Sequence, residues 1–596
     1  MMQKVRFLLL GFVVLWMFLG CPADKISISV TLIPPCVSES KNFKNPLDSI
    51  STISLIAVRE DPNAEPEVIN SASFPYESGG KGIFDIPLSK NVRIVVEGYD
   101  ESNKMILRGA SQLFDVTVNS STNIKVPVFI AGTDAFSQST DYASQECSQL
   151  PDGLQGASVT PLPDGDVLIA GGVKIDGGAR YYYANLYLYN SRTGTFEEIP
   201  IDDTINEYGT RAYHTATLYN KGTDDKPEWK VLIVGGETYI NGKTASISTA
   251  EIYDVATKKV EFLTSTLEEG RMYHTATLMQ NGKIVIIGGE NKVDGKVESY
   301  LDTAEIFDIQ EETFTKLSGK DYNHMTYGRS RHSATYLPLR YNTTEGKPVS
   351  GFDKVLLTGG IRKTGNSLYI NDEMEIFGCA NANCTDYRFD IVRKSDNTSL
   401  KMIQKRYGHQ AVPVMIGADP IGGGDEEFHN FYVVFLGGYT CIGMDRCAGT
   451  TQLTDCNCPD NDVFKSITTK IEIFEPTNSQ GPQLKYTLDM NVARADFAAV
   501  PIERDTDNII IFGGYGTSVG TITDIVETMT VNKKTQTKPA YLKNKLLFPR
   551  ADFGFGLMSN GSIFIVGGEN GKLGNNKASL STVEIFVPSV SSLISE

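Results

Sequence analysis

The sequence predicts an all-β protein in which a seven-bladed β-propeller follows a small β-sandwich. An apolar strand that ends in two glycines recurs seven times after residue 154, as expected for repeated blades. Shorter alternating runs without this repeat precede it, and the 55 Gly, 28 Phe and 27 Tyr are typical of strands and turns. We therefore divide the chain into an export signal (1–20), a sandwich (21–136), a linker or closing strand (137–153) and a propeller (154–596).

The first 20 residues have the pattern of an export signal. Lys4 and Arg6 precede an apolar run, Phe7 to Leu19, whose length of about 13 residues is too short for a membrane-spanning helix. Cys21 and the residues before it resemble the lipidation site of bacterial lipoproteins, although that family usually has Leu where Phe18 stands. The resemblance implies export and an acyl anchor on Cys21 that holds the chain at the outer membrane or cell surface. An ordinary cleaved signal peptide is the alternative.

Eight further cysteines remain, and an exported protein can form disulfides. We expect Cys379 and Cys384 to close one hairpin. Four cysteines crowd into one loop, where two disulfides or a four-thiolate zinc site are chemically possible, and the oxidising location favours disulfides. Cys36 and Cys147 would then tie the N-terminal domain to the start of the propeller, although spacing alone leaves the connectivity open. The eight residues are Cys36, Cys147, Cys379, Cys384, Cys441, Cys447, Cys456 and Cys458.

Short alternating runs between Cys21 and about Phe136 predict a small antiparallel sandwich. One of them, Val92 to Asp100, resembles the immunoglobulin-like or transthyretin-like modules of bacterial surface proteins. The resemblance implies a spacer that holds the propeller away from the membrane, with a second binding module as the alternative. The runs are Lys25 to Leu32, Ser51 to Val58, Val92 to Gly98, Phe114 to Val118 and Asn123 to Ile130.

The double glycine marks the second strand of each propeller repeat. It closes a run of β-branched residues such as Val231 to Val234, at a point where the chain must adopt unusual dihedrals or approach another backbone closely. The pairs are Gly171-Gly172, Gly235-Gly236, Gly288-Gly289, Gly359-Gly360, Gly437-Gly438, Gly513-Gly514 and Gly567-Gly568.

Three further strands accompany each double glycine, which makes four strands per repeat. A strand led by Arg comes before it, as in Arg211 to Thr217. A strand with Glu followed by an aromatic residue comes after it, as in Ala250 to Tyr253, and segments such as Thr195 to Ile199 suggest the fourth strand. Seven units of four strands describe blades that stack around a central axis.

This pattern resembles the kelch family, and the resemblance covers about Leu154 to Glu596. One departure is that kelch repeats often carry Trp on the fourth strand, where Phe196 and Phe314 stand here. The resemblance implies a propeller that binds partners at the mouths of its central channel, through loops of irregular length. Galactose oxidase is built on the same type of propeller, so a copper enzyme is a second expectation.

The recurring Arg and Glu are predicted to be architectural. Repeat one lacks both, because Leu154 and Tyr187 stand at these positions, and joint loss is expected if the two side chains pair within each repeat. The structural repeat residues are Arg211, Arg271, Arg329, Arg406, Arg494 and Arg550 with Glu251, Glu305, Glu375, Glu472, Glu527 and Glu584.

The seventh repeat lacks an obvious fourth strand, since it reaches Phe586 with few residues left. Either the tail Ser589 to Glu596 supplies this strand, or the ring closes with a segment from before repeat one, near Tyr142 to Leu150. Closure removes exposed strand edges that would otherwise invite aggregation.

The chemistry-bearing residues favour binding over catalysis. A net charge of −17 disfavours nucleic acid as a partner. The pairs Tyr213-His214 and Tyr273-His274 resemble a copper-ligating pair of galactose oxidase, but the histidine position also accepts Phe or Ala in other repeats and is therefore predicted to be a packing position. We find no phosphate-binding, zinc-protease or serine-hydrolase motif, and expect neither catalytic residues nor a cofactor.

The predicted function is that of a surface-anchored, non-enzymatic binding or adhesion module for a protein or carbohydrate ligand, with a galactose-oxidase-like copper oxidase as the alternative. Uneven spacing of the double glycines places long insertions in repeats four to six. The ligand-facing surface is accordingly predicted in the loops Ala418 to Asn430 and Cys441 to Asp462.

Overall fold

The computed structural model describes residues 25–589 except 37–44, 61–65, 77–81, 118–123, 202–208, 224, 318–322, 338–340, 343–346, 349–353, 365–366, 380–385, 420–427, 441–465, 477–481, 503–507, 517–520, 532–537 and 572–577. Within these residues the chain is essentially all β, apart from a short 3-10 helix, η1 (Pro46–Ser49). No helix of the described chain is long and apolar enough to cross a membrane. The predicted export signal and Cys21 lie outside the described residues.

The N-terminal domain is one eight-stranded sheet that curls around its own core, which is consistent with the predicted sandwich. Its edge strands lie against each other, where the Asn70 side chain donates to the carbonyl of Asp85. One pairing differs from the antiparallel expectation, because β1 and β8 run parallel. The strands are β1 (Lys25–Ile33), β2 (Thr52–Arg59), β3 (Glu67–Pro75), β4 (Gly82–Pro87), β5 (Ser89–Tyr99), β6 (Met105–Ala110), β7 (Phe114–Val116) and β8 (Ile124–Gly132).

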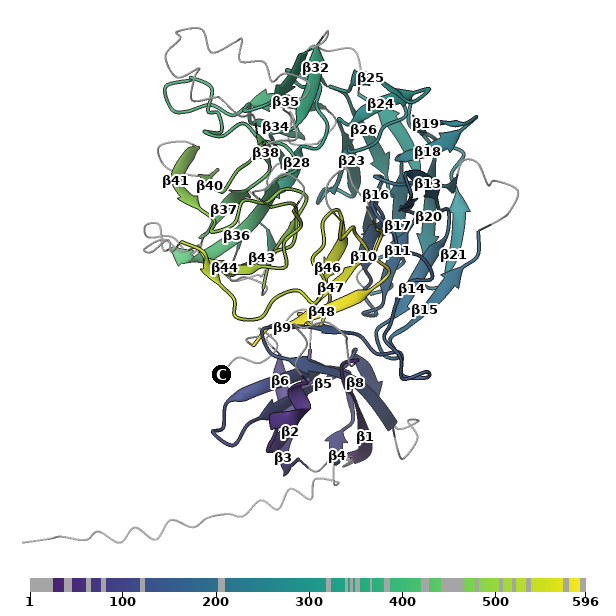
Figure 1. Cartoon of the computed structure of the whole chain (residues 1–596), viewed down its shortest axis with the longest axis vertical. Coiled ribbons are helices and arrows are strands. Elements are labelled where there is room, and N and C mark those ends of the chain that lie inside the picture. Colours follow the sequence, from purple (N-terminus) through teal and green to yellow (C-terminus); the bar gives the residue numbers. More distant parts are fainter. Residues whose placement is uncertain are drawn as a thin grey trace, which may run out of the picture.

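Seven four-stranded sheets follow and form a ring of blades, as the repeat predicts (Figure 1). Blade 1 contains β10 (Ser158–Pro161), β11 (Val167–Ala170), β14 (Leu186–Asn190) and β15 (Thr195–Ile199). Blade 2 contains β16 (Thr215–Asn220), β17 (Trp229–Val234), β20 (Ala250–Asp254) and β21 (Lys259–Phe262). Blade 3 contains β22 (Thr275–Leu278), β23 (Lys283–Ile287), β26 (Ala304–Asp308) and β27 (Thr313–Lys316). Blades 4 and 5 contain β28 (Ser333–Leu337), β31 (Lys354–Thr358), β34 (Glu375–Cys379) and β35 (Tyr387–Ile391); β36 (Gln410–Asp419), β37 (Phe428–Leu436), β40 (Lys470–Glu475) and β41 (Gln483–Asp489). Blades 6 and 7 contain β42 (Ala498–Pro501), β43 (Asn508–Phe512), β44 (Val526–Thr530) and β45 (Ala540–Tyr541); β46 (Gly554–Leu557), β47 (Ile563–Val566), β48 (Val583–Val587) and β9 (Ala135–Gln138).

Two-stranded hairpins connect the second and third strands of blades 1 to 5, all at the same end of the blades. They are β12 (Val173–Asp176) with β13 (Ala179–Tyr182), β18 (Glu237–Ile240) with β19 (Lys243–Ser246), β24 (Glu290–Val293) with β25 (Lys296–Tyr300), β32 (Ile361–Thr364) with β33 (Ser367–Ile370), and β38 (Tyr439–Thr440) with β39 (Ser466–Ile467). A further pair, β29 (Tyr341–Asn342) and β30 (Lys347–Pro348), lies between β28 and β31.

The ring closes with β9, which pairs with β48 through Ala135↔Val587 to Gln138↔Glu584. One of the two predicted sources, a segment from before repeat one, therefore supplies the strand. The segment lies earlier than the predicted Tyr142 to Leu150, and β9 spans the boundary that we placed after residue 136. The alternative tail lies outside the described residues from 590 onward. The sandwich and the ring are thus continuous, because only Thr133 and Asp134 separate β8 from β9.

Every double glycine adopts the left-handed backbone, with φ between 58° and 109°. The second glycine donates its N–H to the carbonyl of the Arg that leads the next blade, at 2.7 to 2.9 Å. At the junction of blades 7 and 1, Gly568 donates in the same way to Leu154. A Cβ on Gly235 would lie 2.6 Å from the Arg271 carbonyl oxygen. Glycine is therefore required both for its dihedrals and for close contact between neighbouring blades.

The structure pairs each of the six repeat arginines with the glutamate of its own repeat, as the joint loss in repeat one predicts. All twelve side chains are no more than 2% exposed. Each guanidinium also donates to the carbonyl of the first glycine, as Arg271 does to Gly288 at 3.0 Å. In five of the repeats the glutamate also accepts a backbone N–H from the segment before the Arg, as Glu305 does from Glu268, so these pairs hold that segment to the blade.

Removing one partner of such a pair is expected to destabilise the propeller strongly. Arg271→Leu leaves the Glu305 carboxylate buried without its countercharge and should cost about 3–5 kcal/mol of unfolding free energy in a urea titration. The double variant Arg271→Leu/Glu305→Tyr copies repeat one and should recover part of that loss.

Arg388→Leu is the matched control, because its pair with Asp390 is about half exposed and should contribute less than about 1 kcal/mol. Equal losses for Arg271→Leu and Arg388→Leu would contradict an architectural role for the buried pairs.

The N-terminal domain contacts the propeller at the end of the blades opposite the hairpins. Gln112 donates to Ser191 in the turn between β14 and β15, at 2.7 Å. Arg93, which is 1% exposed, reaches the carbonyl of Ser559 in the turn between β46 and β47. The hairpin-bearing mouth of the channel therefore faces away from these contacts.

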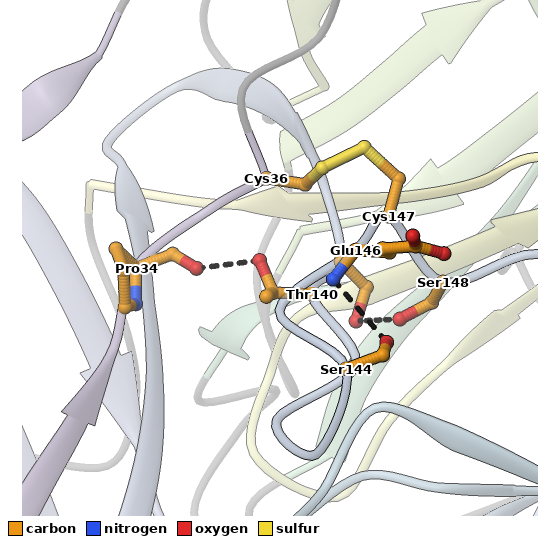
Figure 2. Close-up of a disulfide and its surroundings, with 8 residues drawn as sticks. Pro34, Cys36, Thr140, Ser144, Glu146, Cys147 and Ser148 are labelled. Atoms are coloured by element: carbon orange, nitrogen blue, oxygen red, sulfur yellow. Dashed lines mark hydrogen bonds between the residues drawn. A yellow bond between two sulfur atoms is a disulfide. The ribbon is translucent and has the colours of Figure 1, made fainter.

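A disulfide joins Cys36, just after β1, to Cys147, just after β9 (Figure 2). This confirms the predicted link between the N-terminal domain and the start of the propeller. Beside it, the Thr140 hydroxyl donates to the carbonyl of Pro34 at 2.7 Å. Cys379 is also disulfide-bonded, whereas Cys384 and the cysteines at 441, 447, 456 and 458 lie outside the described residues.

Candidate ligand-binding site at the propeller hub

An inner ring of seven equivalent residues surrounds the axis at the hairpin-bearing mouth. Each stands two positions after the Arg, or after Leu154, that leads its blade, and each has φ between 47° and 60°. Around the ring, six of the backbone N–H groups donate to the carbonyl of the preceding member at 2.8 to 3.3 Å. The ring consists of Gly156, Tyr213, Tyr273, Arg331, Gly408, Asp496 and Asp552. Left-handed Tyr, Arg and Asp are uncommon and persist only where the surrounding structure enforces them, a feature that clusters at functional sites.

The inner ring divides into an aromatic and cationic half and an acidic half. The rings of Tyr213 and Tyr273 lie 4.6 Å apart, and the Arg331 guanidinium lies 3.5 Å from the centre of the Tyr273 ring. Blades 6 and 7 contribute Asp496 and Asp552, and all five side chains are partly exposed. The hub therefore presents both donors and acceptors to a ligand.

The charges of these side chains influence one another's ionisation. Burial raises the pKa of Tyr213 and Tyr273, and the charge of Asp552 raises both further. Burial opposes the charge of Arg331, but Tyr273 and then Asp496 and Glu290 raise its pKa overall. The phenols are thus neutral hydrogen-bond donors, and the guanidinium stays charged.

A second ring of residues packs against the inner ring. Each member is the residue that follows a double glycine, and its backbone pairs with the residue that follows the leading Arg or Leu154. Examples are Glu237 with Ala212 and Tyr439 with Tyr407. The Tyr439 hydroxyl donates to Asp496 at 2.9 Å, and Tyr515 donates to Glu569. These supporting side chains are buried and orient the inner ring.

Hairpins of blades 1 to 3 form a continuous wall beside the hub. Glu237 lies in the blade 2 hairpin and is 1% exposed. Its carboxylate forms ion pairs with Arg180 of the blade 1 hairpin and Lys292 of the blade 3 hairpin, and it accepts a hydrogen bond from the Tyr182 hydroxyl. Gly295 donates its N–H to Thr244 at 2.7 Å, which joins the tips of the second and third hairpins. Glu237 is therefore the residue on which three hairpins converge.

The four repeat histidines pack between blades and do not reach the hub. His214, His274 and His332 each contact a Ser or Thr hydroxyl of the preceding blade through Nε2, at 2.9 to 3.0 Å, and His409 contacts Thr358. Their rings lie over the first glycine of the preceding blade, where Phe497 and Phe553 lie in later repeats. The equivalence with Phe confirms the predicted packing position.

The Tyr-His pairs do not fit a copper site. Tyr213 points to the hub and His214 into the interface between blades, so phenol and imidazole do not converge on one ion. Among the described residues there is no group of three or more His, Cys, Asp or Glu side chains that could hold a metal. His324 lies beside Asp302 at 3.3 Å, and no side-chain position is described for His429.

The predicted ligand loops mostly lie outside the described residues, which include only Ala418–Asp419 and the Phe428–Asn430 part of β37. Sequence reasoning missed the inner ring as a site. Its signal is the position two residues after the leading Arg, where the repeats carry Gly, Tyr, Arg or Asp and so differ in charge.

Three comparisons relate the chain to known proteins. The model of a family described as Kelch motif matches residues 271–320, which comprise blade 3. A solved structure titled "Structure of YjhT" is 15% identical, and the match covers 66% of this chain and 99% of that chain with a TM-score of 0.40. A search of curated proteins finds no match. The Kelch motif model thus matches one blade of this seven-bladed β-propeller, and the other six blades share its four-stranded pattern.

Proposed function

We propose that the chain is a surface-anchored binding module whose ligand, a protein or carbohydrate, enters the hub mouth beside the hairpins. The observation that carries this is the convergence of five partly exposed polar and aromatic side chains from five blades on one mouth. Propeller ligands typically bind where the loops of all blades meet. Specificity then depends on the inner ring and the surrounding loops.

The orientation of the domains supports an anchored role. The N-terminal domain contacts the blades at the end opposite the hairpins. An acyl group on Cys21, four residues before β1, would place the membrane on the side of this domain and leave the hub mouth accessible. The N-terminal domain would then act as a rigid spacer, because β9 and the disulfide fix it to the ring.

A copper oxidase has less support than a binding module. Its chemistry requires several imidazole or phenolate ligands around one ion. Here burial lowers the pKa of the four packed imidazoles, which contact hydroxyls of neighbouring strands, and raises the pKa of the hub phenols. No specific arrangement of the described residues favours that reaction.

An array of glycans and extracellular proteins, incubated with the purified protein, tests the proposed site. At each array spot that the unmodified protein binds, we expect the binding signal of the hub variants Tyr273→Ala and Asp552→Asn to be at least about tenfold lower. Tyr142→Ala is the matched control, because this tyrosine is 47% exposed and its N–H donates to Thr193 in the turn between β14 and β15, at the end of the blades opposite the hairpins. Unchanged binding by both hub variants would place the binding site elsewhere.

A further inference from the structure

We propose that the group held in the hub is a neutral polyhydroxylated ring, the chemistry of an uncharged hexose unit. This inference rests on the hub being the binding site. It follows from three features of the inner ring: unused donors, charges of both signs and a preorganised aromatic stack.

The donors of the hub lack protein partners. The Arg331 guanidinium makes no hydrogen bond or ion pair to any described residue, and it lies over the face of the Tyr273 ring. The six structural arginines, by contrast, are each bound to a carboxylate and to backbone carbonyls. The hydroxyls of Tyr213 and Tyr273 also have no acceptor among the described residues. A ligand with acceptor oxygens would satisfy these donors.

Charges of both signs oppose a strongly charged ligand. Asp496 and Asp552 lie in the inner ring, and Glu290 and Glu569 are buried beside it, so an anion approaching Arg331 meets excess negative charge. A cation approaching the carboxylates meets Arg331 and cannot use its donors. Hydroxyl groups donate to carboxylates and accept from a guanidinium at the same time, so a neutral polyol uses both halves of the hub.

The stack of Tyr213, Tyr273 and Arg331 is held in place before any ligand binds. Gly156 leaves room for the Tyr213 ring, since a Cβ there would lie 2.5 Å from that ring. The backbone ring fixes the positions of Tyr273 and Arg331 through N–H donors at 3.1 Å. Preorganised side chains lose little conformational entropy on binding, which suits a small ligand such as a single sugar unit.

Ligand-observed NMR with isosteric sugars tests the inference. The probes are glucose and galactose, with the amino sugars and uronates of both series as charged counterparts. We expect at least one neutral sugar to bind and to change affinity less than about twofold between 0.05 and 0.5 M NaCl, because neutral ligands are little affected by screening. Arg331→Met and Asp552→Asn should each weaken this binding about tenfold or more.

Arg362→Met is the matched control, because this guanidinium also stacks on tyrosines, Tyr327 and Tyr369, but lies outside the inner ring. Preferential binding of a uronate or an amino sugar, weakened by salt and lost in the hub variants, would overturn the neutral class and leave the hub as the site. Absence of binding for all six sugars would also overturn it. If the hub variants then still fail to bind the array spots that the unmodified protein binds, the hub remains the proposed binding site, but its ligand is not a neutral sugar.

Discussion

Lowering the pH from 7 to 5 is expected to destabilise the propeller by several kcal/mol, because four buried imidazoles stay neutral in the fold. Burial lowers the pKa of His274 and His332 to about 3, and holds the pKa of His214 and His409 well below the usual value. The Nδ1 atoms of His214, His332 and His409 have no hydrogen-bond partner, so a proton on any of them would be buried without an acceptor.

The sign of the effect follows from proton linkage. The folded pKa of His274 and His332 lies below the unfolded value of about 6.5, so the stability contribution is complete above that pH. As the pH falls from about 6.5 towards about 3, the unfolded chain binds protons that the folded chain does not. Each such histidine then lowers the unfolding free energy by about 1.4 kcal/mol per pH unit.

Urea titrations at pH 7, 6 and 5 measure this slope. The variants His274→Phe and His332→Phe copy the Phe found in repeats six and seven, and each should reduce the slope by about 1.4 kcal/mol per pH unit. His324→Phe is the control, because its side chain is 40% exposed and it stands outside the repeat position. An unchanged slope in the two repeat variants would mean that the imidazoles are not the acid-sensitive groups.

The blade count, the double glycines and the Arg–Glu pairs could be predicted from the sequence because the double glycine recurs in all seven repeats and the Arg and Glu recur together in six of them. Repetition also exposed the packing role of His274, since Phe553 occupies the same place in another repeat. Repeat one has Leu154 and Tyr187 in place of the Arg and the Glu. This joint loss predicted that the two side chains pair within one blade, and the structure contains such pairs.

The closing strand and the hub site could not be predicted in the same way. Ala135 to Gln138 has no repeat signature, and it is a strand because the open edge of β48 pairs with it. In its own repeat, Arg331 is only a residue that differs from those at the same position in other repeats. Its place in a binding site depends on Tyr273 and Asp496, which come from other blades. Convergence across blades is a property of the closed ring that no single repeat contains.

Removing the disulfide between Cys36 and Cys147 is expected to lower the unfolding free energy by about 4–5 kcal/mol. The bond closes a sequence separation of 111 residues, and the restriction that it places on the unfolded chain grows with the length of this loop. The variant Cys36→Ser/Cys147→Ser should show this loss in a urea titration under non-reducing conditions. Cys379→Ser is the control for loss of a disulfide elsewhere in the ring, since Cys379 is disulfide-bonded and lies on β34, away from the closing strand.

The ring should open first at β9 in this variant. Only four register pairs join β9 to β48, and the C-terminal end of β9 is held by Cys36, whose N–H donates to the Gln138 carbonyl and whose side chain is bonded to Cys147. Hydrogen exchange of the native state should therefore increase at Phe136 and Ser137 more than at the central strands of blade 3, because local opening follows the weakest cooperative unit. Uniform acceleration in all blades would contradict this order, since it would place the effect of the disulfide on global unfolding alone. A selective effect at β9 would mean that the same bond that fixes the N-terminal domain also keeps the propeller closed.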